Sequence, residues 1–168
     1  MSALKNYQRP EIAGGQLPAG AYAADVAANL AVLEGWITQH PETEFDIFLS
    51  PYSILFWDKV IRDGSVEAVF AAIRQVGETL LQYDNVKIYG YLMDADIVAD
   101  LDNYCDYVHH SGAVCQEILA MLRADEGRLT AENLEETLAS WHEFVIHYDY
   151  EKFWDESFWH QWNAEHGA

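Results

Sequence analysis

Two short apolar runs, 45–49 and 86–91, constrain the fold of this chain most strongly. Both are rich in aromatic and β-branched residues, as buried strands are. Between them, apolar residues recur at helical spacing from Val66 to Leu80, and Ser65 stands at the N-cap position. One helix between two strands predicts a parallel pair. We therefore expect an α/β fold in which 45–49 and 86–91 are adjacent parallel strands, the first covered on both faces.

Three further helices are predicted around this unit. An apolar stripe predicts a first helix that ends at Pro41. A second helix ends near Gly127, and Thr130 is placed to cap a long last helix. The supporting apolar positions are Val26, Leu30, Leu33 and Ile37 in the first, Val114, Ile118, Met121 and Leu122 in the second, and Leu134, Leu138, Trp141, Val145 and Tyr148 in the third. Residues 1–20 are expected to be a loose lead-in, 92–110 a long functional loop, and 21–168 a single α/β domain.

Charge and cysteine content exclude several functions. The chain has 168 residues, 51% of them hydrophobic, and a formal charge of −19. That charge repels phosphate backbones, so no nucleic-acid partner is expected. Two cysteines define neither a disulfide framework nor a structural zinc pattern, and they leave the compartment open. Residues 1–20 contain no apolar run long enough for a signal peptide or a membrane span.

The sharpest chemical motif is Asp106-x-x-His109, between the second strand and the next helix. An Asp three residues before a His can accept its ring N–H, fix the tautomer and leave the other nitrogen free as a base. Taken alone the spacing is more often a chance feature of a surface loop. Its position is more specific, because ligands of open α/β sheets bind outside the carboxyl ends of the strands.

The surrounding stretches, 48–58 (FLSPYSILFWD), 83–89 (YDNVKIY) and 101–104 (LDNY), lead in this order to Asp106 and His109. Together they resemble the SGNH (GDSL-like) hydrolases, in an uncharacterised bacterial branch whose members are often membrane-anchored. The resemblance covers about residues 22–152. It implies the C-terminal part of a three-layer α/β/α, flavodoxin-like domain with a helix-rich C-terminus. It also implies an orienting role for Asp106, a general-base role for His109, and no cofactor or metal.

The serine nucleophile of that superfamily is not found in this chain. None of the seven serines lies in a glycine-flanked turn between a strand and a helix. Ser50, Tyr52 and Ser53, at the end of the first strand, are expected to contact substrate, and a nucleophilic role for either serine is the minor alternative. A metal site on Cys105, Asp106, His109, His110 and Cys115 is disfavoured, because the spacing matches no standard ligand pattern.

Two functions from different classes remain open. The first is an ester hydrolase or O-acyl transferase remnant acting on acyl esters, with cell-surface glycans as a candidate substrate, and inactive as an isolated chain. The second is a non-catalytic binding or assembly module in which the acidic face and an aromatic tail meet a partner. The tail comprises Phe153, Trp154, Phe158, Trp159 and Trp162. Self-association, or pairing with a missing N-terminal half, is expected in either case.

Overall fold

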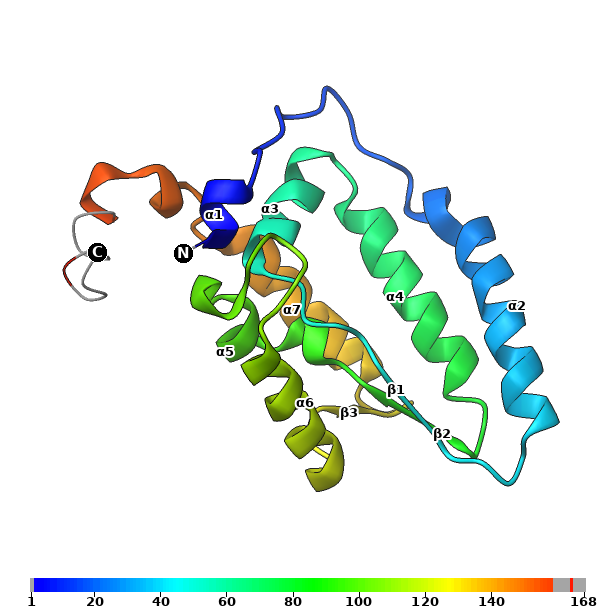
Figure 1. Cartoon of the computed structure of the whole chain (residues 1–168). Helices are drawn as coiled ribbons and strands as arrows, with labels where there is room; N and C mark the ends of the chain where they lie inside the picture. Colours follow the sequence, from blue (N-terminus) through cyan, green and yellow to red (C-terminus); the bar gives the residue numbers. More distant parts are fainter. Residues whose placement is uncertain (1, 159–163, 165–168) are drawn as a thin grey trace.

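The computed structural model describes residues 2–158 and residue 164. The α-helices are α1 (Ser2–Asn6), α2 (Ala23–Gln39), α3 (Ile54–Arg62), α4 (Val66–Leu80), α5 (Ala95–Val98), α6 (Gly112–Ala124) and α7 (Leu134–His147). The strands are β1 (Phe45–Phe48), β2 (Val86–Tyr89) and β3 (Arg128–Leu129). Short 3₁₀ helices are η1 (Ala19–Tyr22), η2 (Tyr91–Met93), η3 (Leu101–Asn103) and η4 (Glu151–Trp154). The fold is therefore mixed α/β, with long helices around a small sheet (Figure 1).

The sheet has the order β1-β2-β3. β1 and β2 are parallel, with Phe45 opposite Val86 and Phe48 opposite Tyr89, as the sequence predicts. β3 runs antiparallel to β2 and was not predicted, because a two-residue strand carries no periodic signal. The described sheet is therefore mixed, with one parallel pair.

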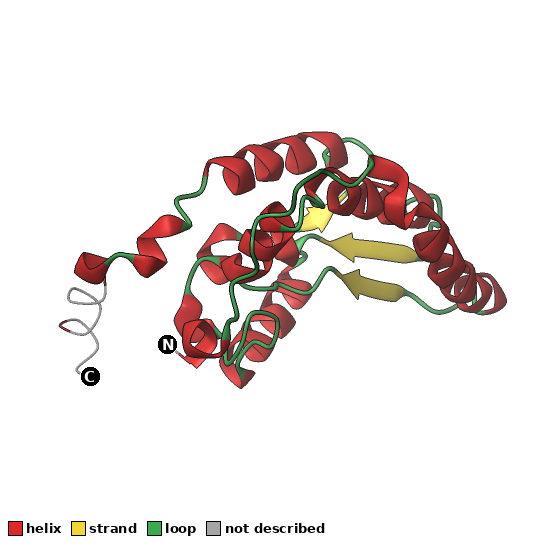
Figure 2. Ribbon diagram, turned by 90° about the horizontal axis from the view of Figure 1, so that it is seen from above, coloured by secondary structure: helices red, strands yellow, loops and turns green. Residues whose placement is uncertain are grey.

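Helices pack on both faces of β2. Val86 and Ile88 belong to the main core with α4 and α7, whereas Tyr89 belongs to a second buried cluster that includes Val114 and Ile118 of α6. Figure 1 shows α6 on the side of the strands away from α2 and α4. Figure 2 shows the two parallel strands pointing the same way beneath the helices. The loops that follow β1 and β2 therefore leave the sheet at the same edge.

The expectation that β1 is covered on both faces is wrong. Phe45 and Ile47 are partly buried against the main core, but Asp46 and Phe48 on the other face are exposed. Phe48 keeps 41% of its surface exposed, and its ring lies 6.1 Å between centroids from that of Tyr91, a buried member of the second cluster. In the described sheet β1 is an edge strand with an uncovered face.

The predicted long helices are confirmed as α2, α4, α6 and α7. The last helix buries Leu134, Leu138, Trp141 and Val145, four of its five predicted core positions. α4 approaches α7 closely at Gly77, where an added Cβ would lie 2.8 Å from Leu134 Cδ2. A side chain at position 77 would therefore require the Leu134 side chain to shift.

Both predicted caps differ in detail from the structure. Ser65 occupies the N-cap position of α4, but its hydroxyl donates to Val60 O at 3.2 Å instead of accepting from the helix. The N-cap of α7 is Asn133, not Thr130. Thr130 lies one turn earlier, where its backbone N–H donates to Asn133 Oδ1 (2.8 Å) and its Oγ1 accepts from Asn133 N (3.3 Å). Thr130 thus supports the cap and does not form it.

The first part of the predicted loose lead-in, residues 2–9, is docked on the core, whereas 11–20 are exposed. α1 buries Ala3 and Leu4 in the main core. Arg9 then reaches the carboxylate of Asp58 on α3, which is 2% exposed, with N–O distances of 2.9 to 3.3 Å. The main core consequently includes side chains from the first turn of the chain to Phe153.

The structure also differs from the prediction in two other segments. The expected long loop 92–110 contains η2, α5 and η3, each too short to show a period in sequence. In the aromatic tail Phe153 is buried, Trp154 is exposed and Phe158 packs against the core. Trp159 and Trp162 lie outside the described residues.

Candidate functional site

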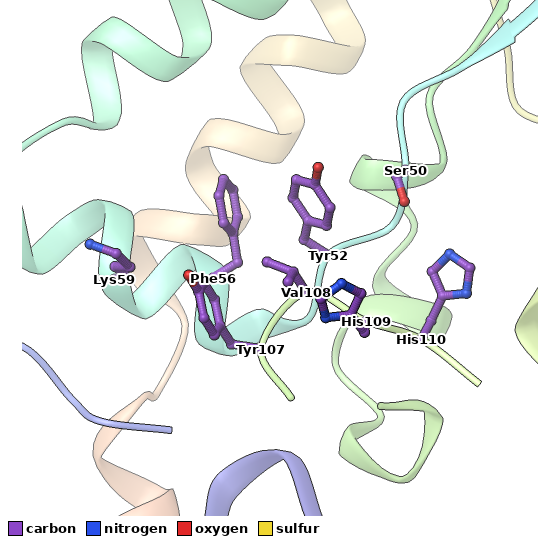
Figure 3. A pocket seen from close by; sticks show the side chains of 8 residues that line it. All are labelled: Ser50, Tyr52, Phe56, Lys59, Tyr107, Val108, His109 and His110. Atoms are coloured by element: carbon purple, nitrogen blue, oxygen red, sulfur yellow. The ribbon is translucent and has the colours of Figure 1, made fainter. Parts of the chain in front are cut away.

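A cleft of about 450 Å³ lies beyond the carboxyl end of β1. Its lining comes from three segments: the chain after β1, the first half of α3, and the loop before α6. The lining residues are Ser50, Tyr52, Phe56, Lys59, Tyr107, Val108, His109 and His110. Figure 3 shows their side chains around one opening. The structure therefore brings His109 to the end of the first strand, as the parallel pairing predicts.

Hydrogen bonds to backbone carbonyls hold these segments together. Leu92 N donates to Leu49 O at 2.9 Å, which ties the end of β1 to the chain that follows β2. The buried hydroxyl of Tyr104 donates to Pro51 O at 2.8 Å. Tyr104 also forms an antiparallel bridge with His110 and so closes the loop 104–110. The position of the loop relative to β1 is thus fixed by bonds and not only by packing.

Asp106 and His109 form the predicted pair. His109 Nδ1 lies 2.7 Å from Asp106 Oδ2. The other carboxylate oxygen, Oδ1, accepts the backbone N–H of Val108 at 2.9 Å and of His109 at 2.8 Å. One carboxylate therefore orders the turn and orients the ring that ends it.

The environment keeps Asp106 ionised. Partial burial opposes ionisation, but the bonds from the Val108 and His109 backbone and from the His109 ring outweigh it and lower the pKa of Asp106. A carboxylate acceptor selects the Nδ1–H tautomer of the neutral ring. The Nε2 of His109 has no hydrogen-bond partner within the part of the chain that the structure describes, and the side chain is 74% exposed. The pair thus offers a solvent-accessible base nitrogen.

The predicted serines have different surroundings. Ser50 is half-buried and lines the cleft. Ser53 is completely buried, and both its hydroxyl (2.8 Å) and its backbone N–H (3.2 Å) donate to Tyr107 O. The expectation that Ser53 contacts substrate therefore does not fit the structure. Its hydroxyl anchors the loop that carries His109.

Sequence reasoning missed half of the lining. Tyr52 was predicted, but its ring packs at a tilt against Phe56 in the first turn of α3, with 4.9 Å between ring centroids, and Tyr107 adds a third aromatic ring. Lys59 brings a cation to the wall and pairs with Asp63, the C-cap of α3. The available signal was the spacing of Phe56 and Lys59, one turn apart on α3 and directly after Tyr52. The site therefore combines a base, a cation and aromatic surface.

No group of three or more His, Cys, Asp or Glu side chains converges on a common point within the described residues. Cys105 and Cys115 are free thiols, both exposed. No helix among the described residues has the length and apolar character needed to cross a membrane.

Comparison with known proteins identifies no relative of this chain. No family model, no curated protein and no solved structure matches the chain. Its function is therefore inferred from the cleft, the Asp106–His109 pair and the open strand edge.

Proposed function

We propose that this chain is the acid–base part of an SGNH-type ester hydrolase or O-acyl transferase that acts on acyl esters, including those of cell-surface glycans. The observation that carries the proposal is the 2.7 Å bond between Asp106 and His109 beside the cleft at the end of β1. In such enzymes the base takes a proton from a hydroxyl nucleophile, and the carboxylate stabilises the imidazolium that forms. The corresponding fold is the C-terminal part of a three-layer α/β/α, flavodoxin-like domain.

The cleft walls suit an ester or a sugar. The rings of Tyr52, Phe56 and Tyr107 offer apolar surface on which a sugar ring or an acyl chain can pack. Lys59 can donate to an ester or sugar oxygen, and Ser50 is the hydroxyl on the wall that can contact the same group.

A nucleophile must reach this site from another segment. The hydroxyl of Ser53 is buried and bonded to Tyr107 O, and that of Ser111 caps α6 by accepting from Val114 N. No hydrogen bond joins Ser50 to His109 within the described residues, and no pair of backbone N–H groups there is identified as an oxyanion hole. We therefore assign this chain the base and the binding surface, and we expect no turnover by the chain alone.

The test is to translate the DNA upstream of the start codon and co-express any segment that encodes a strand followed by Gly-x-Ser. The pair should hydrolyse p-nitrophenyl acetate, and His109→Ala should abolish that activity by removing the base. His147→Ala is the matched control, because His147 is an exposed histidine on α7 away from the cleft. Hydrolysis that survives His109→Ala, or an upstream region with no such segment, contradicts the proposal.

The open edge of β1 favours a second candidate, a non-catalytic assembly module. Phe48 on β1 and Val32 and Trp36 on α2 are exposed apolar side chains. An edge strand with exposed apolar residues is a pairing surface for another strand. If the chain assembles through this edge, Phe48→Lys should lower its apparent mass in light scattering, whereas Val32→Lys should not. Equal effects of both variants would instead indicate contact through α2.

A further inference from the structure

The thiol of Cys115 lies against a second histidine of the same loop. Cys115 Sγ is 3.6 Å from His110 Nδ1, within hydrogen-bond range for sulfur. Both residues are held from outside the pair. His110 is bridged to Tyr104, and the backbone N–H of Cys115 donates to Ser111 O at 3.3 Å in the first turn of α6. The contact therefore joins two ordered elements.

The other cysteine provides an internal comparison. Cys105 is also exposed, but its thiol donates to the backbone carbonyl of His109 at 3.3 Å. A carbonyl accepts a hydrogen bond from a thiol but cannot take its proton. An imidazole with a bare Nδ1 can take the proton. His110 Nδ1 also lies 3.4 Å from Ser111 O, so once protonated it can donate to that carbonyl and to the thiolate. Both thiols are thus exposed, whereas only that of Cys115 has an imidazole nitrogen within hydrogen-bond range.

The start of α6 acts in the same direction. α6 is 13 residues long, and its first turn contains no acidic side chain. The partial positive charge at a helix N-terminus stabilises an anionic sulfur. The nearest carboxylate in sequence is Glu117, two residues after Cys115 and beyond the first turn of α6, and Asp106 is bonded to His109 and to two backbone N–H groups.

We propose that Cys115 is a nucleophilic thiol, activated by His110, that exchanges with small disulfides to form a mixed disulfide at the rim of the cleft. His110 takes the thiol proton, and the Cys115 sulfur attacks one sulfur of the disulfide. The S–S bond of the small molecule breaks as the new S–S bond forms. The released thiolate takes the proton from His110.

The modification would change the cleft as well as the thiol. His110 lines the cleft wall, so a group attached to Cys115 lies against a residue of the candidate site. The formal charge of −19 favours cationic or neutral disulfides over anionic ones. Cystamine, a small cationic disulfide, is therefore the probe of choice.

The test is a timed reaction of the intact chain with limiting cystamine, quenched with acid and mapped by peptide mass spectrometry. Cys115 should form the mixed disulfide about 10-fold faster than Cys105 in the folded chain. In urea the two rates should converge, because the contact with His110 is then lost. Folded-state rates within about twofold of each other, or a faster Cys105, would overturn the proposal.

The variant test separates His110 from other exposed histidines. His110→Gln should bring the rate of Cys115 close to that of Cys105, because an amide cannot accept the thiol proton. His147→Gln, on α7 and away from this loop, should leave the rate of Cys115 unchanged. An unchanged rate in His110→Gln contradicts the proposal, and the comparison of the two cysteines in the unmodified chain needs no variant to fold. Neither outcome depends on ester hydrolysis, so this inference and the proposed function are tested separately.

Discussion

Arg9→Ala removes the cation that neutralises a buried carboxylate. Asp58 is 2% exposed, and its carboxylate accepts from the Arg9 guanidinium and from the Tyr7 hydroxyl at 2.9 Å. The same guanidinium bonds to the exposed Glu151 at 2.7 Å and lies 3.8 Å from the ring centre of Trp154. Arg9 thereby connects the N-terminal segment, α3 and the chain after α7.

The buried contact dominates the expected loss. Breaking a buried ion pair by removing one partner typically costs about 3–5 kcal/mol, because the remaining charge is left without compensation. The contact with Glu151 adds little, because that carboxylate is exposed and solvent screens it. The cation–π contact adds about 0.5–1 kcal/mol. We therefore expect Arg9→Ala to lower the free energy of unfolding by about 4 kcal/mol, a large part of the ~5–15 kcal/mol that stabilises a typical domain.

Urea unfolding at pH 7, followed by tryptophan fluorescence, measures this loss. Arg74→Ala is the matched control, because Arg74 pairs with Glu135 at 2.7 Å but at the surface, and should cost no more than about 1 kcal/mol. Adding Asp58→Asn to Arg9→Ala should recover part of the loss, since it removes the uncompensated charge. A loss below about 1 kcal/mol in Arg9→Ala, or strictly additive effects in the double variant, would refute the reasoning.

Three further predictions concern the site and the surface. The purified chain should hydrolyse p-nitrophenyl acetate no faster than its His109→Ala variant, and turnover that Ser50→Ala abolishes would instead identify Ser50 as a nucleophile. The lowered pKa of Asp106 stabilises the fold above the unfolded value of about 3.9 and loses that contribution as pH falls through the folded value. Asp106→Asn should accordingly flatten the acid limb of a stability–pH curve, and an unchanged limb would contradict this. The full chain should self-associate in light scattering, and deletion from Phe153 onward should increase association because Phe153 is buried in the core. Reduced association would show that the tail is the adhesive contact, and a strictly monomeric chain would contradict the fragment interpretation.

The local pattern of apolar residues was sufficient to predict the helices and strands in which that pattern is regular. The stripes over 26–37, 66–80 and 134–148 predicted α2, α4 and α7, and two apolar runs predicted β1 and β2 as neighbours. Parallel pairing then placed the loop with His109 at the end of β1, because parallel strands finish at the same edge. The Asp106–His109 bond followed from spacing, since three residues suffice for a carboxylate to reach the ring.

Tertiary contacts decided the rest of the site. No local signal distinguishes Ser50, on the cleft wall, from Ser53, whose hydroxyl is buried against Tyr107 O from a segment 54 residues away. Lys59 and Phe56 join the site only because α3 starts beneath the loop of Tyr107 and His109.

Tertiary contacts also decided which face of β1 is exposed and where the N-terminal segment packs. The sequence alone determined that 45–48 forms an apolar strand, but its exposed face depends on α6 covering β2 and leaving Phe48 open. Residues 2–9 have no period that predicts order, and they dock because a buried carboxylate on α3 binds Arg9. The period of apolar residues shows which face of a helix or strand is buried. Which other element covers that face depends on contacts between residues distant in sequence.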